Sequence, residues 1–118
     1  MLLINNLCYN YMRWLLVKIV TICGSLKFQK EMMEEAQKLA FEGNCVLTPV
    51  YPVLEDIEIT KEQVKFLKEE HFKKIELSDF IYVLDKDGYM GESTKLEIDY
   101  AVSLGKNVIY YSDGGAYE

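Results

Sequence analysis

The sequence has 118 residues, a formal net charge of -6 and 50% hydrophobic residues, with three cysteines and one histidine. A chain of this length folds as one domain around one core, and its apolar content excludes a disordered protein. The acidic balance excludes a nucleic-acid polymer as partner, because a negative surface repels phosphates, but it is compatible with a small anion held by a few local groups.

The three cysteines are Cys8, Cys23 and Cys45, and they form no CxxC pair and have no histidine cluster beside them in sequence. This spacing predicts neither a zinc site nor a disulfide-stapled secreted fold. An odd number of scattered thiols is typical of the reducing cytoplasm, which we take as the predicted location.

Residues 1–17 are apolar but are interrupted by three asparagines and an arginine. They lack the basic start of a signal peptide and the length of a membrane span, so no membrane association is predicted. One interpretation is an amphipathic turn that packs on the domain or on a second subunit, because apolar residues recur at helical spacing at Leu3, Leu7, Tyr11 and Trp14. We favour a frayed extension, or an upstream start with the functional protein beginning near Met12. Residues 18–118 are then the single domain.

From Lys18 onward, short β-rich runs alternate with longer amphipathic segments. Residues 18–23 predict a buried strand that ends at Gly24-Ser25, and residues 26–42 predict a helix ended by Gly43-Asn44. The apolar stripe of this helix comprises Phe28, Met32, Ala36, Leu39 and Ala40. Residues 45–51 predict the second strand.

In the second half, Thr60 to Gln63 reads as a capping box that opens a helix. The apolar residues predicted to face the sheet from this helix are Val64, Leu67, Phe72, Ile75 and Leu77. Residues 80–84 predict a third strand, 94–104 a further helix and 107–111 a fourth strand. The pattern predicts an α/β fold, a Rossmann-like or flavodoxin-like three-layer sandwich with a mostly parallel sheet of four to five strands.

In such a sheet, ligands bind beyond the carboxyl ends of the strands. The first loop at that edge contains Gly24, Ser25 and Lys27, whose backbone N–H groups and ammonium group predict a phosphate site. The alternative is a plain turn in which Ser25 caps the helix, because neither nucleotide-binding glycine motif is present.

The second loop, residues 85–93, leads into Thr94-x-x-Glu97. Four of its residues are candidate substrate contacts: Asp85, Tyr89, Gly91 and Ser93. Glu97 has two interpretations. It either completes a capping box with Thr94, which spacing alone favours about twofold, or serves as an ionised nucleophile in the first turn of the helix.

His71 is the single histidine, on the helix before the third strand. A lone helical histidine is usually a bystander and, without a second ligand, makes no metal site. If its ring reaches the crevice, it is a candidate acid or base at neutral pH. Asp79 is interpreted as a structural turn group at the start of that strand.

Three segments together resemble the nucleoside 2-deoxyribosyltransferase superfamily, and within it the 2'-deoxynucleoside 5'-phosphate N-hydrolases. They are residues 22–27, 78–83 and 96–106. The resemblance spans nearly all of residues 18–111 and places Glu97 at the family's nucleophile. It also places Ser25 at a phosphate-contacting serine and Lys27 at a basic residue of the monophosphate-specific branch.

Two positions depart from the family. Thr21 stands where the family has a tyrosine that orients the nucleophile, and His71 stands where it has an aspartate that handles protons. Much of the segment that in the family crosses to a neighbouring subunit is also missing after residue 111. These departures favour an alternative, a non-catalytic nucleotide-binding or sensor module of the same fold.

The resemblance implies cleavage or 2-deoxyribosyl transfer at the N-glycosidic bond of a 2'-deoxynucleoside or its 5'-monophosphate. Glu97 would be the nucleophile and His71 would protonate the leaving base. The implied partner is a small nucleoside or nucleotide, no metal or organic cofactor is required, and the implied assembly is a homodimer or higher homo-oligomer.

Overall fold

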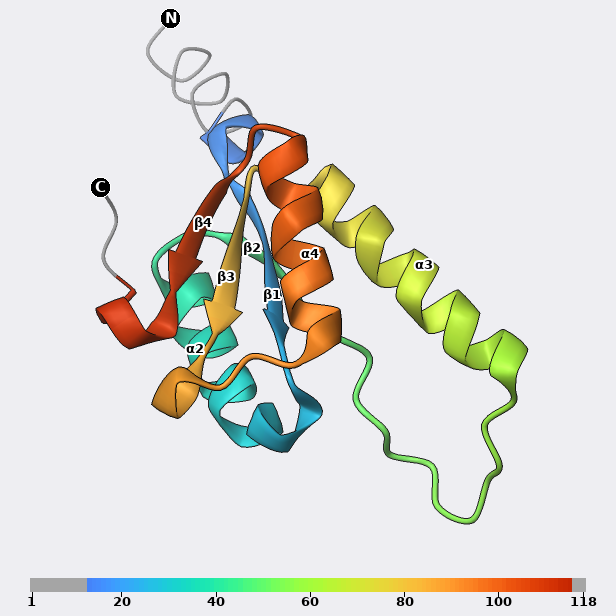
Figure 1. Ribbon diagram of the computed structural model, residues 1–118. Coiled ribbons are helices and arrows are strands. Elements are labelled where there is room, and N and C mark those ends of the chain that lie inside the picture. Colours follow the sequence, from blue (N-terminus) through green and yellow to red (C-terminus); the bar gives the residue numbers. More distant parts are fainter. Residues whose placement is uncertain (1–12, 116–118) are drawn as a thin grey trace, which may run out of the picture.

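The computed structural model describes residues 13–115, in which one sheet is flanked by helices (Figure 1). The helices are α2 (Gln29–Phe41), α3 (Lys61–Leu77) and α4 (Glu92–Ser103). The strands β1 (Ile19–Gly24), β2 (Cys45–Leu47), β3 (Phe80–Leu84) and β4 (Asn107–Tyr110) are all parallel, in the order β2-β1-β3-β4. The predicted α/β fold with a parallel sheet is therefore confirmed.

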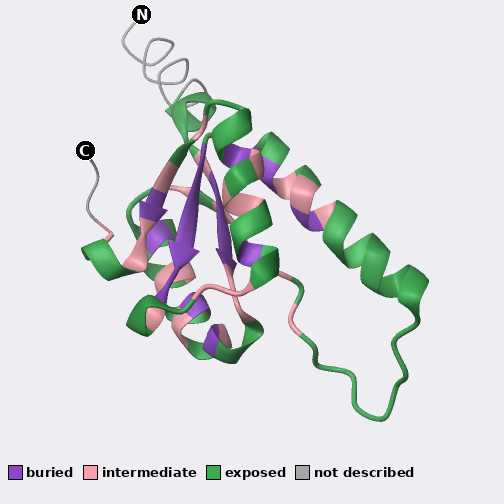
Figure 2. Ribbon diagram, viewed as in Figure 1, coloured by how far each residue is buried: buried purple, intermediate pink, exposed green. Residues whose placement is uncertain are grey.

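The sheet divides the core into two layers, because successive side chains of a strand point to opposite faces. On one face, Val20, Ile22 and Tyr82 pack against Met32 and Leu39 of α2. The residues on the other face pack against α3 and α4, and they are Cys23, Ile81 and Val83 with Ile75 and Ala101. Figure 2 shows that burial is concentrated in β1 and β3, the two central strands. These strands read as nearly continuous apolar runs because helices cover both of their faces.

Strand β2 and helix α2 are shorter than the sequence indicated. Strand β2 ends at Leu47, not at residue 51, because Pro49 has no N–H with which to continue the ladder. The segment predicted as a helix from residue 26 begins with a short 3-10 turn, Leu26–Phe28, and α2 proper starts at Gln29. On the predicted stripe of this helix, Met32 and Leu39 are buried but Ala40 is exposed.

Helix α3 begins as predicted but does not lie on the sheet along its whole length. Thr60 and Gln63 form the capping box with hydrogen bonds of 3.1 and 2.9 Å. Ile75 is buried, whereas Val64, Leu67 and Leu77 are 40–57% exposed, so the prediction that all of its apolar residues face the sheet is wrong. A helix of 17 residues is about 25 Å long, but a strand of five spans only about 16 Å, so α3 overshoots the sheet (Figure 1).

Loop groups tie the elements to the sheet. Asp79 accepts a hydrogen bond of 2.7 Å from the Ile19 N–H, which fits the structural role predicted for it. After α2, Gly43 adopts a φ of +100° and Asn44 donates to the Leu39 carbonyl at 2.9 Å, as predicted for a C-terminal cap.

The predictions for Leu3, Leu7, Tyr11 and Met12 lie outside the described residues, as does Cys8. Of that predicted helical stripe only Trp14 is described, in a short 3-10 turn where it is 63% exposed. Among the helices of residues 13–115, none combines the length and the apolar character needed to cross a membrane.

Candidate functional site

A cavity of about 500 Å³ lies at the carboxyl end of β1, between the start of α4 and the middle of α3. Strands β1 and β3 are neighbours, although β2 lies between them in sequence, so the strand order reverses at this point. Such a switch point is where parallel α/β sheets bind ligands. The polar residues that line the cavity are Ser25, Lys68, Glu70, His71, Glu92, Ser93, Thr94 and Glu97.

Gly24 ends β1 at the floor of this cavity. A Cβ atom at Gly24 would lie 3.2 Å from both the Leu84 Cβ and the Met32 Sδ, so a side chain here would push β1 away from its neighbours. The residue is glycine because of this close packing, and the loop that follows stays near the sheet edge. Ser25 then caps the next turn by accepting a hydrogen bond from the Lys27 N–H at 3.4 Å.

Helix α4 begins at Glu92 with Gly91 as its N-cap, two residues earlier than predicted. Thr94 is therefore inside the helix and buried, so the predicted Thr94–Glu97 capping box is wrong. Glu97 lies in the second turn rather than the first, where the helix dipole has little effect on a carboxylate. Its side chain points inward and is only 16% exposed.

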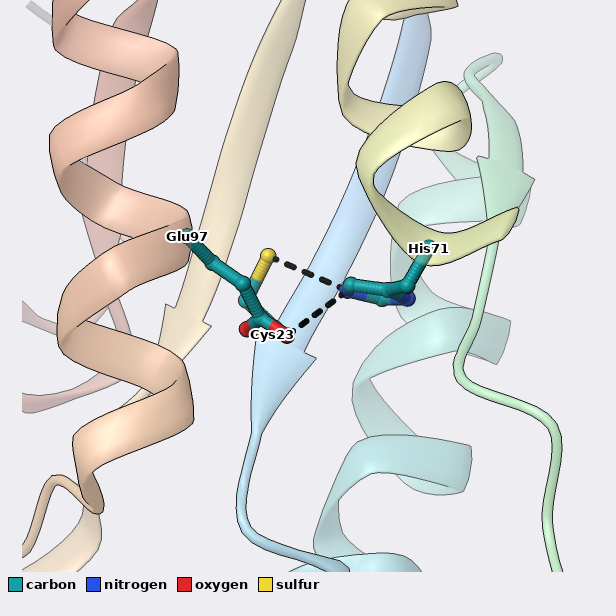
Figure 3. A group of neighbouring side chains, drawn as sticks. All are labelled: Cys23, His71 and Glu97. Carbon is teal, nitrogen blue, oxygen red and sulfur yellow. Dashed lines mark hydrogen bonds and ion pairs between the residues drawn. The ribbon is translucent and has the colours of Figure 1, made fainter. Parts of the chain in front are cut away.

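Three side chains from three elements meet beside the cavity, as Figure 3 shows: Cys23 of β1, His71 of α3 and Glu97 of α4. The His71 Nε2 atom lies 3.6 Å from a Glu97 carboxylate oxygen and 3.5 Å from the Cys23 Sγ atom. The Cys23 Sγ atom and a Glu97 carboxylate oxygen lie within 4.8 Å of each other. The other ring nitrogen of His71, Nδ1, is buried and has no hydrogen-bond partner among the described residues.

Burial sets the protonation states of this cluster. Burial raises the pKa of the Glu97 carboxyl to about 7, although the hydrogen bond with Cys23 acts in the opposite direction. It lowers the pKa of His71 to about 4, with the positive charge of Lys74 adding to the effect and Glu70 opposing it. The pKa of the Cys23 thiol is raised by burial first and then by the Glu97 charge. Near neutral pH, the imidazole and the thiol are therefore uncharged.

Six of the nine predicted site residues line this one cavity: Gly24, Ser25, His71, Gly91, Ser93 and Glu97. The other three do not. Lys27 lies over the ring of Tyr89, with 3.2 Å between its Nζ atom and the ring centroid. Asp85 is buried and accepts hydrogen bonds of 2.8 and 2.6 Å from the N–H and hydroxyl of Ser112, which ties β3 to the segment after β4.

Neither Cys23 nor Lys68 was predicted from the sequence as a site residue. Cys23 is fully buried at the end of β1. Because successive strand residues face opposite sides, its neighbour Ile22 packs on α2 and Cys23 faces α3 and α4. Its proximity to His71 and Glu97 depends on the fold and has no signal in the local sequence. Thr21 lies on the same face and its hydroxyl is 2.5 Å from that of Ser78, away from the cavity. Lys68 is the one cationic side chain among the described cavity-lining residues.

Similarity to solved structures supports the fold. A 2-deoxyribosyltransferase from Bacillus psychrosaccharolyticus superimposes with a TM-score of 0.61 and 18% identity, covering 78% of this chain and 70% of that one. The 2-desoxiribosyltransferase from Leishmania mexicana gives a TM-score of 0.59 and 17% identity, over 79% and 63% of the two chains. A conserved protein from Enterococcus faecalis V583 gives 0.56 and 14%, over 80% and 62%.

These likenesses show that the chain has the nucleoside 2-deoxyribosyltransferase-like fold. The chain spans between 62% and 70% of the lengths of these three structures. No protein-family model and no curated protein matches the sequence significantly.

Proposed function

We propose that this protein cleaves, or transfers, the N-glycosidic bond of a 2'-deoxynucleoside or its 5'-monophosphate, with Glu97 as the nucleophile. The observation that carries the proposal is a carboxylate only 16% exposed, beside a cavity at the sheet's switch point and 3.6 Å from an imidazole. The fold shared with two deoxyribosyltransferases supports the class of reaction.

The reaction proceeds in two steps. A carboxylate oxygen of Glu97 attacks the anomeric carbon through an oxocarbenium-like transition state, and the bond from that carbon to the base breaks. The electron pair leaves with the base, which takes up a proton, and a glycosyl ester of Glu97 remains. Water then releases the sugar, or a second base accepts it. A 2-deoxy sugar favours this route because it lacks the electron-withdrawing hydroxyl that would raise the barrier.

The proton comes from the pair formed by Glu97 and His71. With pKa values of about 7 and about 4, the two side chains together hold one proton between these limits, on the Glu97 carboxyl. Transfer of this proton to the His71 Nε2 atom leaves Glu97 ionised for attack and makes His71 the acid for the leaving base. The distance of 3.6 Å shortens to a hydrogen bond in this step, as catalytic contacts commonly tighten once substrate is bound.

Recognition of the sugar's 5' end falls to the loop around Ser25 and to the N-terminus of α4 at Gly91 and Ser93, which face the same cavity. Lys68 supplies the positive charge for a 5'-phosphate, a role predicted from the sequence for Lys27. In the structure, Lys27 instead packs on Tyr89 outside the cavity.

The test follows free base by chromatography while the protein is incubated with a panel of deoxynucleosides and deoxynucleoside monophosphates. We expect Glu97→Gln to lower base release by at least about 1,000-fold. Asp99→Asn, on the exposed side of the same helix, is the matched control and keeps the parent rate. Undiminished release in Glu97→Gln would exclude this carboxylate as the nucleophile.

If no base is released or exchanged above the Glu97→Gln background, while nucleotides still raise the melting temperature, the non-catalytic binding module replaces the enzyme. Phosphate recognition is tested separately by comparing monophosphate with nucleoside. Lys68→Gln is expected to raise KM for the monophosphate about tenfold and to leave KM for the nucleoside unchanged, since only the former carries the charge. If Lys27→Gln raises KM for the monophosphate and Lys68→Gln does not, then Lys27 is the residue that binds the phosphate.

A further inference from the structure

We propose that Cys23, His71 and Glu97 form a binding site for a Zn²⁺ ion at the inner wall of the cavity. The sulfur, ring nitrogen and carboxylate oxygen that they offer all lie within 4.8 Å of one another. One soft sulfur, one imidazole nitrogen and one carboxylate oxygen are a ligand set that suits zinc, whereas magnesium and calcium prefer oxygen alone.

Two of the three pairs of ligand atoms have the spacing of tetrahedral coordination. Zinc bonds of roughly 2.3 Å to sulfur and 2.0 to 2.2 Å to nitrogen and oxygen require ligand atoms about 3.4 to 3.6 Å apart in a tetrahedron. The Cys23 Sγ to His71 Nε2 distance is 3.5 Å, and the His71 Nε2 to Glu97 oxygen distance is 3.6 Å. The Cys23 Sγ atom and the Glu97 oxygen lie within 4.8 Å of each other, so a bound metal draws this third pair together to about 3.6 Å while the other two distances already fit.

Charge and access also favour this ion. A thiolate and a carboxylate neutralise the two charges of zinc while the imidazole stays neutral, so the buried site carries no net charge when filled. Cys23 is fully buried behind the other two ligands, while His71 and Glu97 line the cavity. The fourth coordination position consequently faces the cavity, which is the arrangement of an open zinc site.

This site shares Glu97 and His71 with the proposed nucleophile and its proton partner. A carboxylate oxygen that binds zinc is not free to attack an anomeric carbon. Zinc is therefore expected to inhibit glycosyl transfer. That consequence rests on the proposed function, but the binding of zinc does not.

The test uses the whole chain after treatment with a chelator. Zn²⁺ is titrated against a chromophoric chelator, and Co²⁺ is added separately for its absorption spectrum. We expect one equivalent of Zn²⁺ to bind, and Co²⁺ to give a thiolate charge-transfer band together with the visible bands of tetrahedral cobalt. Mg²⁺ is expected to displace neither ion.

Two variants locate the ligands. Cys23→Ser is expected to weaken zinc binding by at least about 100-fold and to abolish the thiolate band, since loss of a direct ligand exceeds the 10- to 100-fold cost of losing a group behind one. Cys45→Ser, at the exposed cysteine of β2, is the control and keeps both. Glu97→Gln, which preserves shape and leaves Cys23 in place, is expected to weaken zinc binding comparably, and circular dichroism verifies that each variant is folded.

The proposal is overturned if zinc binds the parent and Cys23→Ser equally, or if binding is lost in Cys45→Ser. The same experiments distinguish an incorrect zinc site from an incorrect proposed function. Base release that depends on Glu97 but is unaffected by Zn²⁺, with no zinc bound, would reject the metal site and keep the enzyme. Zinc binding that needs Cys23, without any base release, would support the site and reject the enzyme.

Discussion

The two halves of α3 have similar amphipathic sequences but different surroundings. In the C-terminal half, His71 and Ile75 are buried against β1 and α4. In the N-terminal half, Val64, Phe66 and Leu67 are 40–55% exposed. Phe66 and Leu67 line a cavity against the long connection before the helix, residues 48–60. Figure 2 shows this change from a partly buried to an exposed helix along α3. Helical spacing therefore determines which residues share a face, while the length of the sheet determines how much of that face is covered.

The boundary between the two halves is where the candidate site lies. Lys68 and Glu70 are beside the cavity on the outer side, and His71 is the first buried residue of the helix. A titratable group at this boundary is desolvated but still within reach of a ligand. Such a position is typical of side chains with perturbed pKa values at functional sites.

The largest change is expected in the free energy of unfolding, when an apolar side chain is truncated in each half of α3. Ile75→Ala removes a fully buried side chain and is expected to lower the free energy of unfolding by about 2 to 5 kcal/mol. Leu67→Ala, at a similar side chain that is 40% exposed in the outer half, is expected to cost about 1 kcal/mol or less. Urea unfolding measures both. Equal losses would mean that the outer half is covered in solution.

The next effect concerns the pH dependence of base release, measured with a chelator present. The proposed mechanism needs the one proton that the Glu97 and His71 pair holds between pKa values of about 4 and about 7. The quantity kcat/KM is therefore expected to fall about tenfold per unit as the pH rises above 7. An increase through pH 7 would instead indicate that Glu97 attacks already ionised and that the proton comes from elsewhere.

A smaller effect is expected in the pH dependence of stability. The folded pKa of Glu97 is raised from 4.5 to about 7, so its contribution is present below pH 4.5 and is lost as the pH rises through 7. The folded pKa of His71 is lowered from 6.5 to about 4, so its contribution is present above pH 6.5 and is lost as the pH falls through 4. In the parent protein the stability contributions of Glu97 and His71 therefore change with pH in opposite directions and nearly cancel.

Single variants separate the two contributions to the pH dependence of stability. Glu97→Gln leaves His71 alone, so stability is expected to rise with pH between about 4 and 6.5. His71→Gln leaves Glu97 alone, so stability is expected to fall between pH 4.5 and about 7. Each change is on the order of 1 to 3 kcal/mol after allowance for partial exposure. Urea unfolding at several pH values measures it, and slopes of the same sign in both variants would contradict the assignment.

The smallest expected effect tests the outer half of α3 by itself. Thr60→Ala removes the capping box at its start and is expected to cost about 1 kcal/mol. Hydrogen exchange should show the loss of protection in the first turns of α3 and not around Ile75, because the packed half does not depend on the cap. Loss of protection along the whole helix would show that the two halves unfold together.

The sequence predicted most of the fold correctly because its signals are local. The apolar run at residues 80–84 is the strand β3, and Thr60 with Gln63 is the cap of α3. The misplaced start of α4 has the same origin: Thr94 and Glu97 have the spacing of a capping box, but the N-cap is Gly91, three residues before Thr94. Local spacing does not distinguish two overlapping caps when the outcome depends on what the side chains pack against.

In the candidate site, too, some residues were predictable from local sequence and others depend on the tertiary structure. The glycines and serines of the two loops were predictable, since they follow strands whose ends share one edge of the sheet. The spacing of the cysteines indicated no metal ligands, because Cys23 is 48 residues from His71 in sequence. Only the tertiary structure, by placing β1 against α3 and α4, brings this thiol to the imidazole and the Glu97 carboxylate. Burial among these elements, which no local pattern encodes, determines the protonation states on which the proposed chemistry depends.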